Sequence, residues 1–171
     1  LGADRFRAVA TAAIRDATNS SQAADRIESA AGIPVQVISE NEEGRLAFLG
    51  ATKALGYQVE GRVAVVDVGG GSTEITIGTV EDGVEQVRSW PIGSGQLAEE
   101  LVASDPPSAA EIRRVRDRVD EFFEDVQITP PEQAVAVGGS ATSLRKIAGT
   151  RLEYETLERS IRVLSGDDAV E

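Results

Sequence analysis

The first third of the chain alternates short apolar runs with stretches of helical composition. Two runs, Phe6–Thr11 and Pro34–Ile38, have the length and composition of short strands. Helices are predicted beside them, at residues 12–17, 20–31 and 41–55. In the last helix, Leu46, Leu49 and Leu55 would form the apolar side. This alternation of strand and helix over the first 56 residues predicts an α/β fold.

The middle of the chain has a different pattern. Three strands are predicted in a row, at residues 63–68, 72–80 and 84–90. The first is a continuous apolar run, as in a strand that is buried on both faces. Glu81-Asp82-Gly83 predicts a hairpin turn between the second and the third. Because no helix separates these strands, we expect a domain boundary near residues 56–61, with domains at 1–56 and 57–171.

The remainder is mostly helical. Ser108 and Glu111 have the spacing of a capping box at the start of a long helix that would run to about Val126. A fourth strand is predicted at 133–137, followed by helices at 141–148 and 153–164.

Composition limits the chemistry. The chain has 17 Lys and Arg against 29 Asp and Glu, a net charge of −12, with no basic tract to displace the counterions of a nucleic acid. Histidine and cysteine are absent, which excludes Ser-His-Asp catalysis, thiolate chemistry and His-ligated zinc. Carboxylates must therefore act as any catalytic acid or base. A bound metal ion would have oxygen ligands, which favours Mg²⁺. No apolar run reaches membrane-spanning length and no signal peptide is evident, so we expect a cytoplasmic protein without a membrane partner.

The strongest chemical signal is the stretch Asp67–Glu74, Asp-Val-Gly-Gly-Gly-Ser-Thr-Glu. A buried strand would bring Asp67 to its carboxyl end, and Gly69–Gly71 would then turn the chain. Glycines let backbone N–H groups approach an anion, and the hydroxyls of Ser72 and Thr73 would add donors. Asp67 would hold Mg²⁺ against the bound phosphate. The structural alternative is a glycine-rich hairpin turn with a buried Asp that backbone amides satisfy.

Two further features are weak when taken alone. Gly138-Gly139-Ser140 follows a strand and could be a second phosphate-binding turn or an ordinary strand-to-helix connection. Glu42 and Glu43 stand at a predicted helix N-terminus, where the helix dipole favours acids in any case. Adjacent residues of a helix point about 100° apart, so only one of the two can face a given cleft.

Three stretches together carry a resemblance to a known family. Ala10–Asn19, Val37–Arg45 and Asp67–Glu74 are similar in sequence, order and spacing to motifs of the Ppx/GppA family, the exopolyphosphatases and guanosine pentaphosphate phosphohydrolases. Pro91-Ile92-Gly93 also looks like the family. The strand–glycine loop–strand pattern resembles the phosphate grip of actin-like folds. The resemblance implies an actin-like (ribonuclease H-like) α/β fold, as a fragment with part of a first domain and most of a second.

The resemblance also implies roles for single residues. Glu43 matches the catalytic carboxylate, the general base that activates water, and Asp67 matches the acid associated with Mg²⁺. Glu74 matches a further catalytic acid, and Arg15 and Asn19 match polar residues that face the cleft. The implied phosphate ligands are Gly69, Gly70, Gly71, Ser72, Thr73, Asn19, Gly139 and Ser140.

The chain departs from the family at several points. Glu40 stands where the family usually has Gly, and Gly44 stands where it has Ala, at a cost of about 1 kcal/mol in helix propensity. We find no counterpart of the family's opening Asp-x-Gly-Ser-Asn-Ser loop or of the end of its second domain, and the chain begins at Leu1 without any Met. We therefore expect an excised piece of a longer protein that hydrolyses polyphosphate poorly or not at all on its own.

The implied function is Mg²⁺-dependent release of terminal phosphate from inorganic polyphosphate or from guanosine pentaphosphate, a compound of the stringent response. A homodimer is possible, and no nucleic-acid partner is expected. Two other classes remain open at this point. One is a module that binds polyphosphate or an alarmone without hydrolysis. The other is a kinase or ATPase of the actin-like fold, in which Glu42 and Glu43 would be incidental.

Overall fold

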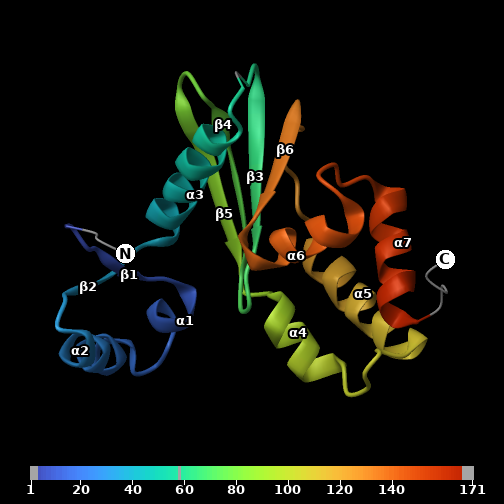
Figure 1. Ribbon diagram of the computed structural model, residues 1–171, viewed down its shortest axis with the longest axis horizontal. Helices are drawn as coiled ribbons and strands as arrows, with labels where there is room; N and C mark the ends of the chain where they lie inside the picture. The colour runs from blue at the N-terminus through green and yellow to red at the C-terminus, as the bar shows by residue number, and fades with distance from the viewer. Residues whose placement is uncertain (1–3, 58, 167–171) are drawn as a thin grey trace.

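The computed structural model describes residues 4–57 and 59–166, and its strands form two sheets with helices beside them (Figure 1). The smaller sheet pairs the parallel strands β1 (Ala8–Ala10) and β2 (Val35–Val37). The larger has the order β5-β4-β3-β6, with β3 at Arg62–Val68, β4 at Thr73–Thr79, β5 at Gly83–Trp90 and β6 at Gln133–Val137. The helices are α1 (Ala12–Arg15), α2 (Ser20–Ala31), α3 (Glu40–Ala54), α4 (Ser94–Leu101), α5 (Ala109–Phe123), α6 (Gly138–Ala148) and α7 (Tyr154–Ser165).

The alternation predicted for the first part of the chain is confirmed, with shorter elements. β1 and β2 share three residue pairs. The helix predicted at 12–17 ends at Arg15, and Asn19 takes the N-cap position of α2. Gly32 ends α2 with a left-handed φ of 68°, which glycine adopts without strain. These elements form the lobe on the left of Figure 1.

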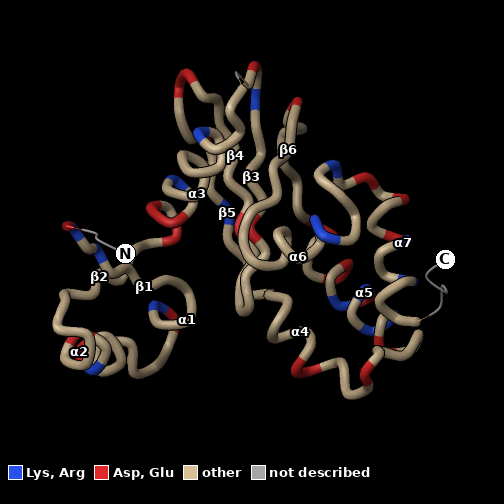
Figure 2. The backbone as a smooth tube through the Cα atoms, viewed as in Figure 1, with Lys and Arg blue, Asp and Glu red and all other residues tan. Residues whose placement is uncertain are grey.

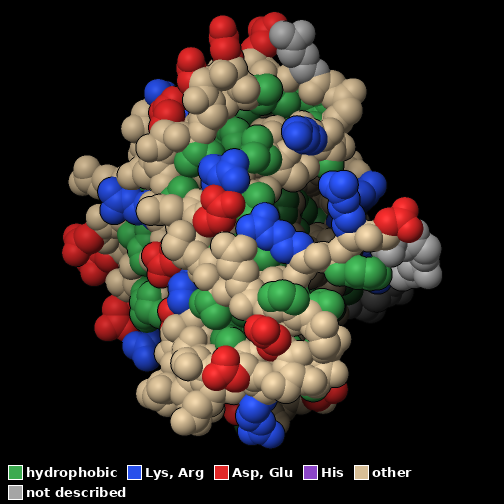
Figure 3. Space-filling view, turned by 90° about the vertical axis from the view of Figure 1, so that its left-hand side faces the viewer, with side chains coloured by type: hydrophobic (Ala, Val, Ile, Leu, Met, Phe, Trp, Pro, Cys, Tyr) green, Lys and Arg blue, Asp and Glu red, His purple; other side chains and the backbone are tan. Residues whose placement is uncertain are grey.

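This lobe leaves apolar side chains uncovered. Figure 3 shows the left-hand face of the molecule, where hydrophobic side chains reach the surface between charged ones. The exposed apolar residues of its elements are Val9, Ile27 and Val37, and the adjoining helix α3 adds Leu46 and Leu49, each at least 36% exposed. A two-stranded sheet with short helices has too little surface to bury both of its faces.

The larger sheet has the predicted three-stranded meander plus a parallel edge strand. β3, β4 and β5 pair antiparallel in sequence order, and β6 pairs parallel with β3. Since β3 and β6 run the same way, their carboxyl ends meet at one edge of the sheet. The helix predicted to begin at residue 141 begins at Gly138 instead, so the Gly138-Gly139-Ser140 stretch is the first turn of α6.

α3 crosses one face of the larger sheet and supplies much of its core. Phe48 and Ala51 are buried in one cluster with Val59, Val63 and Val65. α3 precedes the domain boundary expected near residues 56–61, yet it packs on the sheet that follows this boundary. The boundary itself stays a prediction.

The apolar side of α3 differs from the predicted one. Leu46 and Leu49 are 39% and 36% exposed, so their assignment to the core was wrong, whereas Leu55 does pack against the core. The buried positions of this helix are Gly44, Phe48 and Ala51. Their spacing of four and three residues defines a single helix face. Glycine has no side chain, so hydrophobicity alone could not identify Gly44 as part of that face.

The remaining helices lie on the other side of the larger sheet, at the right of Figure 1. The capping box of Ser108 and Glu111 is confirmed, and α5 ends at Phe123 rather than near Val126. Glu111 also accepts hydrogen bonds from the amides of Ala103 and Ser104, which fixes the connection between α4 and α5. In the part of the chain that the structure describes, no helix has the length and hydropathy needed to cross a membrane.

Candidate active site

The candidate site lies at the edge of the larger sheet where β3 ends. Asp67 is the penultimate residue of β3, opposite Glu74 on β4 and Val137 on β6. α6 begins directly beside it, because Gly138 follows β6. A Cβ at Gly138 would clash with the carboxylate of Asp67, and its φ of 86° also requires glycine. The Asp67 carboxylate therefore sits at the first turn of a helix, in space that the missing side chain leaves free.

Two carbonyl groups of the glycine loop after β3 bind the start of α4. The carbonyls of Gly69 and Gly70 accept hydrogen bonds, each 2.9 Å long, from the amides of Ser94 and Gln96 at the start of α4. Within the described residues, the amides of Gly70, Gly71 and Ser72 donate no hydrogen bond. Unpaired amides in successive glycines are the donors that phosphate-binding loops present to an anion. The loop thus has the geometry expected for binding phosphate.

Three carboxylates converge at this edge. Burial raises the pKa of Asp67, and the negative charge of Glu43 raises it further. Burial also raises the pKa of Glu74, and the charges of Glu43 and Asp67 add to this, while hydrogen bonds from Ser72 and Ser89 oppose it. Figure 2 shows the acidic positions in the first turn of α3, to which Glu43 belongs. The structure therefore brings the three predicted acids, from three different elements, within electrostatic reach of one another.

Arg15 holds Glu43 in place. Its Nη1 donates to Oε2 of Glu43 at 2.7 Å and to the carbonyl of Ile38 at 3.3 Å. Asp16 lies 3.3 Å and Glu40 3.8 Å from other nitrogens of the same guanidinium group. The side chains of Arg15 and Glu43 are 15% and 22% exposed, so their ion pair is largely shielded from water. Glu40, which stands where the family usually has glycine, thus adds a second acid of α3 near Arg15.

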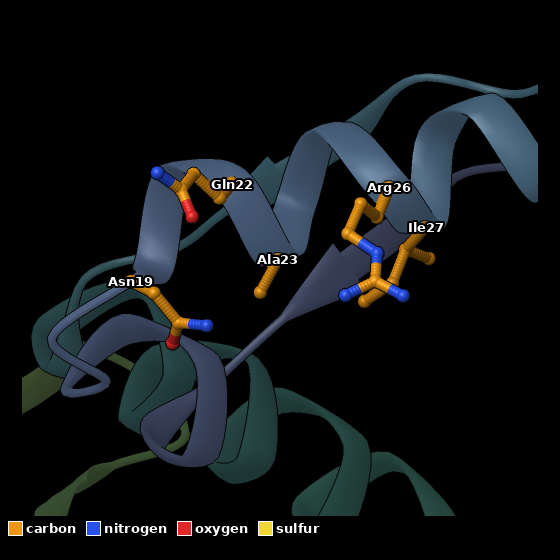
Figure 4. Close-up of a pocket in the computed structure, with 5 residues that line it drawn as sticks. All are labelled: Asn19, Gln22, Ala23, Arg26 and Ile27. Atoms are coloured by element: carbon orange, nitrogen blue, oxygen red, sulfur yellow. The ribbon is translucent and has the colours of Figure 1, made fainter.

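Two predicted phosphate ligands have different surroundings. The hydroxyl of Thr73 is buried and donates to the carbonyl of Ile92 at 2.6 Å, so its proton is used inside the fold. Asn19 takes the N-cap position of α2, and its side chain makes no capping hydrogen bond. It lines a surface hollow whose other residues are Gln22, Ala23, Arg26 and Ile27 (Figure 4). Among the described residues, no hydrogen bond or ion pair connects Asn19 with the three carboxylates.

Three residues of the site were missed by the sequence analysis. Ser89 donates to Oε1 of Glu74 at 2.9 Å, and Ser94 contacts both the glycine loop and Ser140. Gly93 packs on the backbone of the glycine loop so closely that a Cβ there would clash with it. The Gly-Ser-Gly sequence at 93–95 overlaps the family-like Pro91-Ile92-Gly93. It was the signal that could have identified Gly93 and Ser94.

The donors present fit a hard divalent cation of the kind the sequence favours. No three His, Cys, Asp or Glu side chains of the described residues form a metal-binding group by themselves. Asp67 is partly buried beside the like charge of Glu43, and no cationic side chain in the described ranges forms an ion pair with it. Mg²⁺ is commonly held by one or two carboxylates together with substrate phosphates, so Asp67 is a suitable protein ligand.

Replacing Asp67 by asparagine should stabilise the protein at neutral pH. The folded state raises the pKa of Asp67, so the ionised carboxylate costs folding free energy at pH 7. Asp67→Asn should raise Tm by roughly 2–4 °C at pH 7, the shift that about 1 kcal/mol produces in a chain of this size. Because the carboxyl group is protonated in both states at low pH, this gain should disappear below the ordinary pKa of 3.8.

Thermal unfolding without divalent cations, measured from pH 3.5 to pH 8, tests this expectation. Asp117→Asn, at an exposed position of α5, serves as the control for the loss of one negative charge. A lower Tm for Asp67→Asn than for the parent protein at pH 7 would show that the carboxylate stabilises the fold.

Comparison with known proteins agrees with this geometry. Residues 1–163 match the Ppx/GppA phosphatase family, and the chain belongs to that family. It is 33% identical over 153 residues to Exopolyphosphatase 1 of Mycobacterium leprae, covering 86% of this chain and 44% of the relative. It is 34% identical over 178 positions to Exopolyphosphatase 2 of Mycobacterium tuberculosis, covering 99% of this chain and 55% of the relative. The chain thus spans about half the length of the curated relatives that it matches.

Solved structures give the same result for the fold. The PPX-GPPA enzyme of Aquifex aeolicus superposes with a TM-score of 0.73 at 30% identity, over 96% of this chain and 58% of that one. An exopolyphosphatase from Cytophaga hutchinsonii superposes with a TM-score of 0.71 at 25% identity, over 83% of this chain and 46% of that one. The predicted actin-like α/β fold is confirmed.

Proposed function

We propose that the protein containing this chain hydrolyses the terminal phosphoanhydride bond of inorganic polyphosphate. The observation that carries the proposal is the convergence of Glu43, Asp67 and Glu74 beside the free amides of the glycine loop. An anion cradle next to several acids suits phosphoryl transfer, which requires a bound phosphate and a base for the attacking water. The names of the curated relatives, both exopolyphosphatases, support polyphosphate as the substrate.

In the proposed reaction, the loop amides hold the oxygens of the terminal phosphate. Glu43 takes a proton from a water molecule as the water oxygen bonds to the terminal phosphorus. The bond between that phosphorus and the bridging oxygen breaks, and the bridging oxygen leaves with the electron pair on the shortened chain. The products are orthophosphate and a chain that is one unit shorter.

Arg15 has a positioning task in this scheme. Its hydrogen bond fixes the carboxylate of Glu43 in one orientation, with Oε2 held and Oε1 not used by that bond. A base must lie in hydrogen-bonding reach of its water molecule, so this orientation serves the proton transfer.

The predicted Mg²⁺ remains part of the proposal, with Asp67 as its protein ligand. When bound, it would neutralise charge on the phosphate oxygens and so favour attack by water. Glu74 is buried opposite Asp67 on the neighbouring strand, and the hydroxyl of Ser89 donates a hydrogen bond to it. We assign Glu74 the task of adding negative charge beside Asp67, whose own charge raises the pKa of Glu74.

Guanosine pentaphosphate is the second candidate substrate. It offers the same terminal phosphoanhydride, and no residue described above distinguishes the two compounds. A role in the stringent response, a cytoplasmic location, a homodimer and the inactivity of this chain alone all stay predictions.

Phosphate release by the intact protein tests the proposal. It should release orthophosphate from polyphosphate in the presence of Mg²⁺, with guanosine pentaphosphate and ATP assayed in parallel. Binding of polyphosphate without release would favour a binding module. Turnover of ATP alone would favour a kinase or ATPase and contradict the proposal.

A further inference from the structure

The start of α4 is packed directly on the glycine loop. The amides of Ser94 and Gln96 bind the carbonyls of Gly69 and Gly70, as described above. Gly93 and Gly95 leave no room between this segment and Gly70, because a Cβ on either would lie 3.1 Å or less from the backbone of Gly70. The carbonyls of Gly69 and Gly70 are therefore held by α4, while the amides of Gly70, Gly71 and Ser72 donate no hydrogen bond within the described residues.

The hydroxyl group of Ser94 extends this contact to a second turn. It donates to the carbonyl of Gly69 at 3.1 Å and lies 3.2 Å from the hydroxyl oxygen of Ser140 in the first turn of α6. Ser94 thus joins two turns that are 71 positions apart in the sequence (Gly69 to Ser140) and that both follow strands ending at one sheet edge. Both turns were predicted phosphate ligands, whereas Ser94 was not.

The protons of the two hydroxyl groups determine which group donates in each of these hydrogen bonds. A serine hydroxyl has one proton to donate, and the carbonyl of Gly69 can only accept. Since Ser94 donates to Gly69, Ser140 is the donor in the contact between the two hydroxyls. The proton of Ser140 is then used, and the donors that remain for an anion are the backbone amides at the start of α6 and in the glycine loop.

We infer that Ser94 is a positioning residue that holds these two turns at the spacing at which their amides bind the same terminal phosphate. The inference rests on the proposed function for the identity of the phosphate donor. Ser94 acts through the loop carbonyl and through Ser140, and it does not touch the reacting atoms. A residue that fixes a binding cradle for the bound substrate and the transition state alike affects KM more than kcat.

The test uses the intact protein with Ser94 replaced by alanine or by threonine. Ser94→Ala removes both contacts and should raise KM for polyphosphate about 3- to 10-fold, as expected for a lost hydrogen bond, with kcat within about twofold. Ser94→Thr keeps the hydroxyl group and should restore KM to within about twofold of the parent value. Ser143→Ala is the matched control, since Ser143 is an exposed serine of α6 whose side chain makes no hydrogen bond within the described residues.

A KM for Ser94→Ala equal to that of Ser143→Ala would overturn the inference. So would an equal loss in the alanine and threonine variants together with a lower Tm in both, because that pattern marks a packing role that does not depend on the hydroxyl.

A binding measurement separates this inference from the proposed function. Calorimetric titration with tripolyphosphate, in EDTA to prevent hydrolysis, should show the same 3- to 10-fold loss of affinity for Ser94→Ala and recovery for Ser94→Thr. This result would support Ser94 as a positioning residue even if the parent protein released no phosphate, which would contradict the proposed reaction alone. Equal affinity in the parent protein and in Ser94→Ala would overturn the inference whatever the activity.

Discussion

Replacing Glu43 by glutamine in the intact protein is expected to lower kcat by roughly 10²–10⁴-fold, the usual contribution of a general base. Glutamine keeps the size of the side chain, and its carbonyl oxygen can still accept the hydrogen bond that Arg15 donates at 2.7 Å. The variant therefore loses the ability to take a proton while its position is preserved. Affinity for polyphosphate should be unchanged or slightly higher, because one negative charge near the phosphates is removed.

Glu42→Gln is the matched control. Glu42 is the preceding residue of α3, and both of its carboxylate oxygens accept hydrogen bonds of 2.9 Å from Arg45. This pair lies on the outer surface of the helix, where an ion pair contributes little. The kcat of Glu42→Gln should therefore stay within about twofold of the parent value. A larger loss for Glu42→Gln than for Glu43→Gln in the same buffer would show that the base has been assigned to the wrong residue.

The second large effect concerns Gly44, the residue after the proposed base. A Cβ at this position would lie 2.6 Å from the hydroxyl oxygen of Thr76 and 2.7 Å from a methyl carbon of Val87. Thr76 is 1% exposed and Val87 is partly buried. Both side chains are β-branched, so neither can turn away easily. Gly44→Ala should therefore cost about 1–3 kcal/mol and lower Tm by roughly 3–10 °C. It should also lower kcat/KM, since α3 must move away from the sheet and carry Glu43 with it.

Gly50→Ala is the control on the same helix. Gly50 is exposed, and a Cβ there would meet no atom within 4 Å. Alanine is the better helix former by about 1 kcal/mol, so this variant should raise Tm by roughly 2–4 °C and leave kcat/KM unchanged. The same substitution at two positions of one helix should thus have opposite signs. If Gly44→Ala also raised Tm, close packing of α3 on the sheet would not be the reason for glycine at position 44.

Gly44 also shows where inference from sequence stops. Its departure from the family's alanine was interpreted as a loss of helix propensity, which is a local property. In the structure, this glycine lets α3 approach β4 and β5, which is a property of packing between elements far apart in sequence. The wrong assignment of Leu46 and Leu49 has the same origin. A helix buries the side that faces its partner, and a core position without a side chain leaves no mark in the hydrophobic pattern.

The strand pattern was more informative. The continuous apolar run of β3, the turn at Gly83 and the alternation of β4 follow from local chemistry, so the meander could be predicted. The cross-strand neighbours could not. An irregularity between Ile77 and Gly78 shifts the register of β4 and β5 by one residue. Counting back from the turn without it would place Arg88 opposite Glu74, whereas the structure places Ser89 there.

The residues of the candidate site also differ in how far the sequence could predict them. Asp67, Glu74 and the glycine loop are contiguous in the sequence, and their chemistry is visible in a single motif. The pairing of Arg15 with Glu43 spans 28 positions and was expected only from the resemblance to a family. The contact of Ser94 with Ser140 spans 46 positions and depends on the parallel pairing of β6 with β3, which no local pattern encodes.

The most direct measurement for the central claim is hydrolysis of polyphosphate by the intact protein in ¹⁸O-labelled water. If Glu43 activates a water molecule that attacks the terminal phosphorus, each released orthophosphate should contain one ¹⁸O atom from the solvent, and the remaining chain should contain none. The label would then follow the loss of single units from the chain end. Label at the end of the shortened chain would show attack on the penultimate phosphorus and would contradict the account.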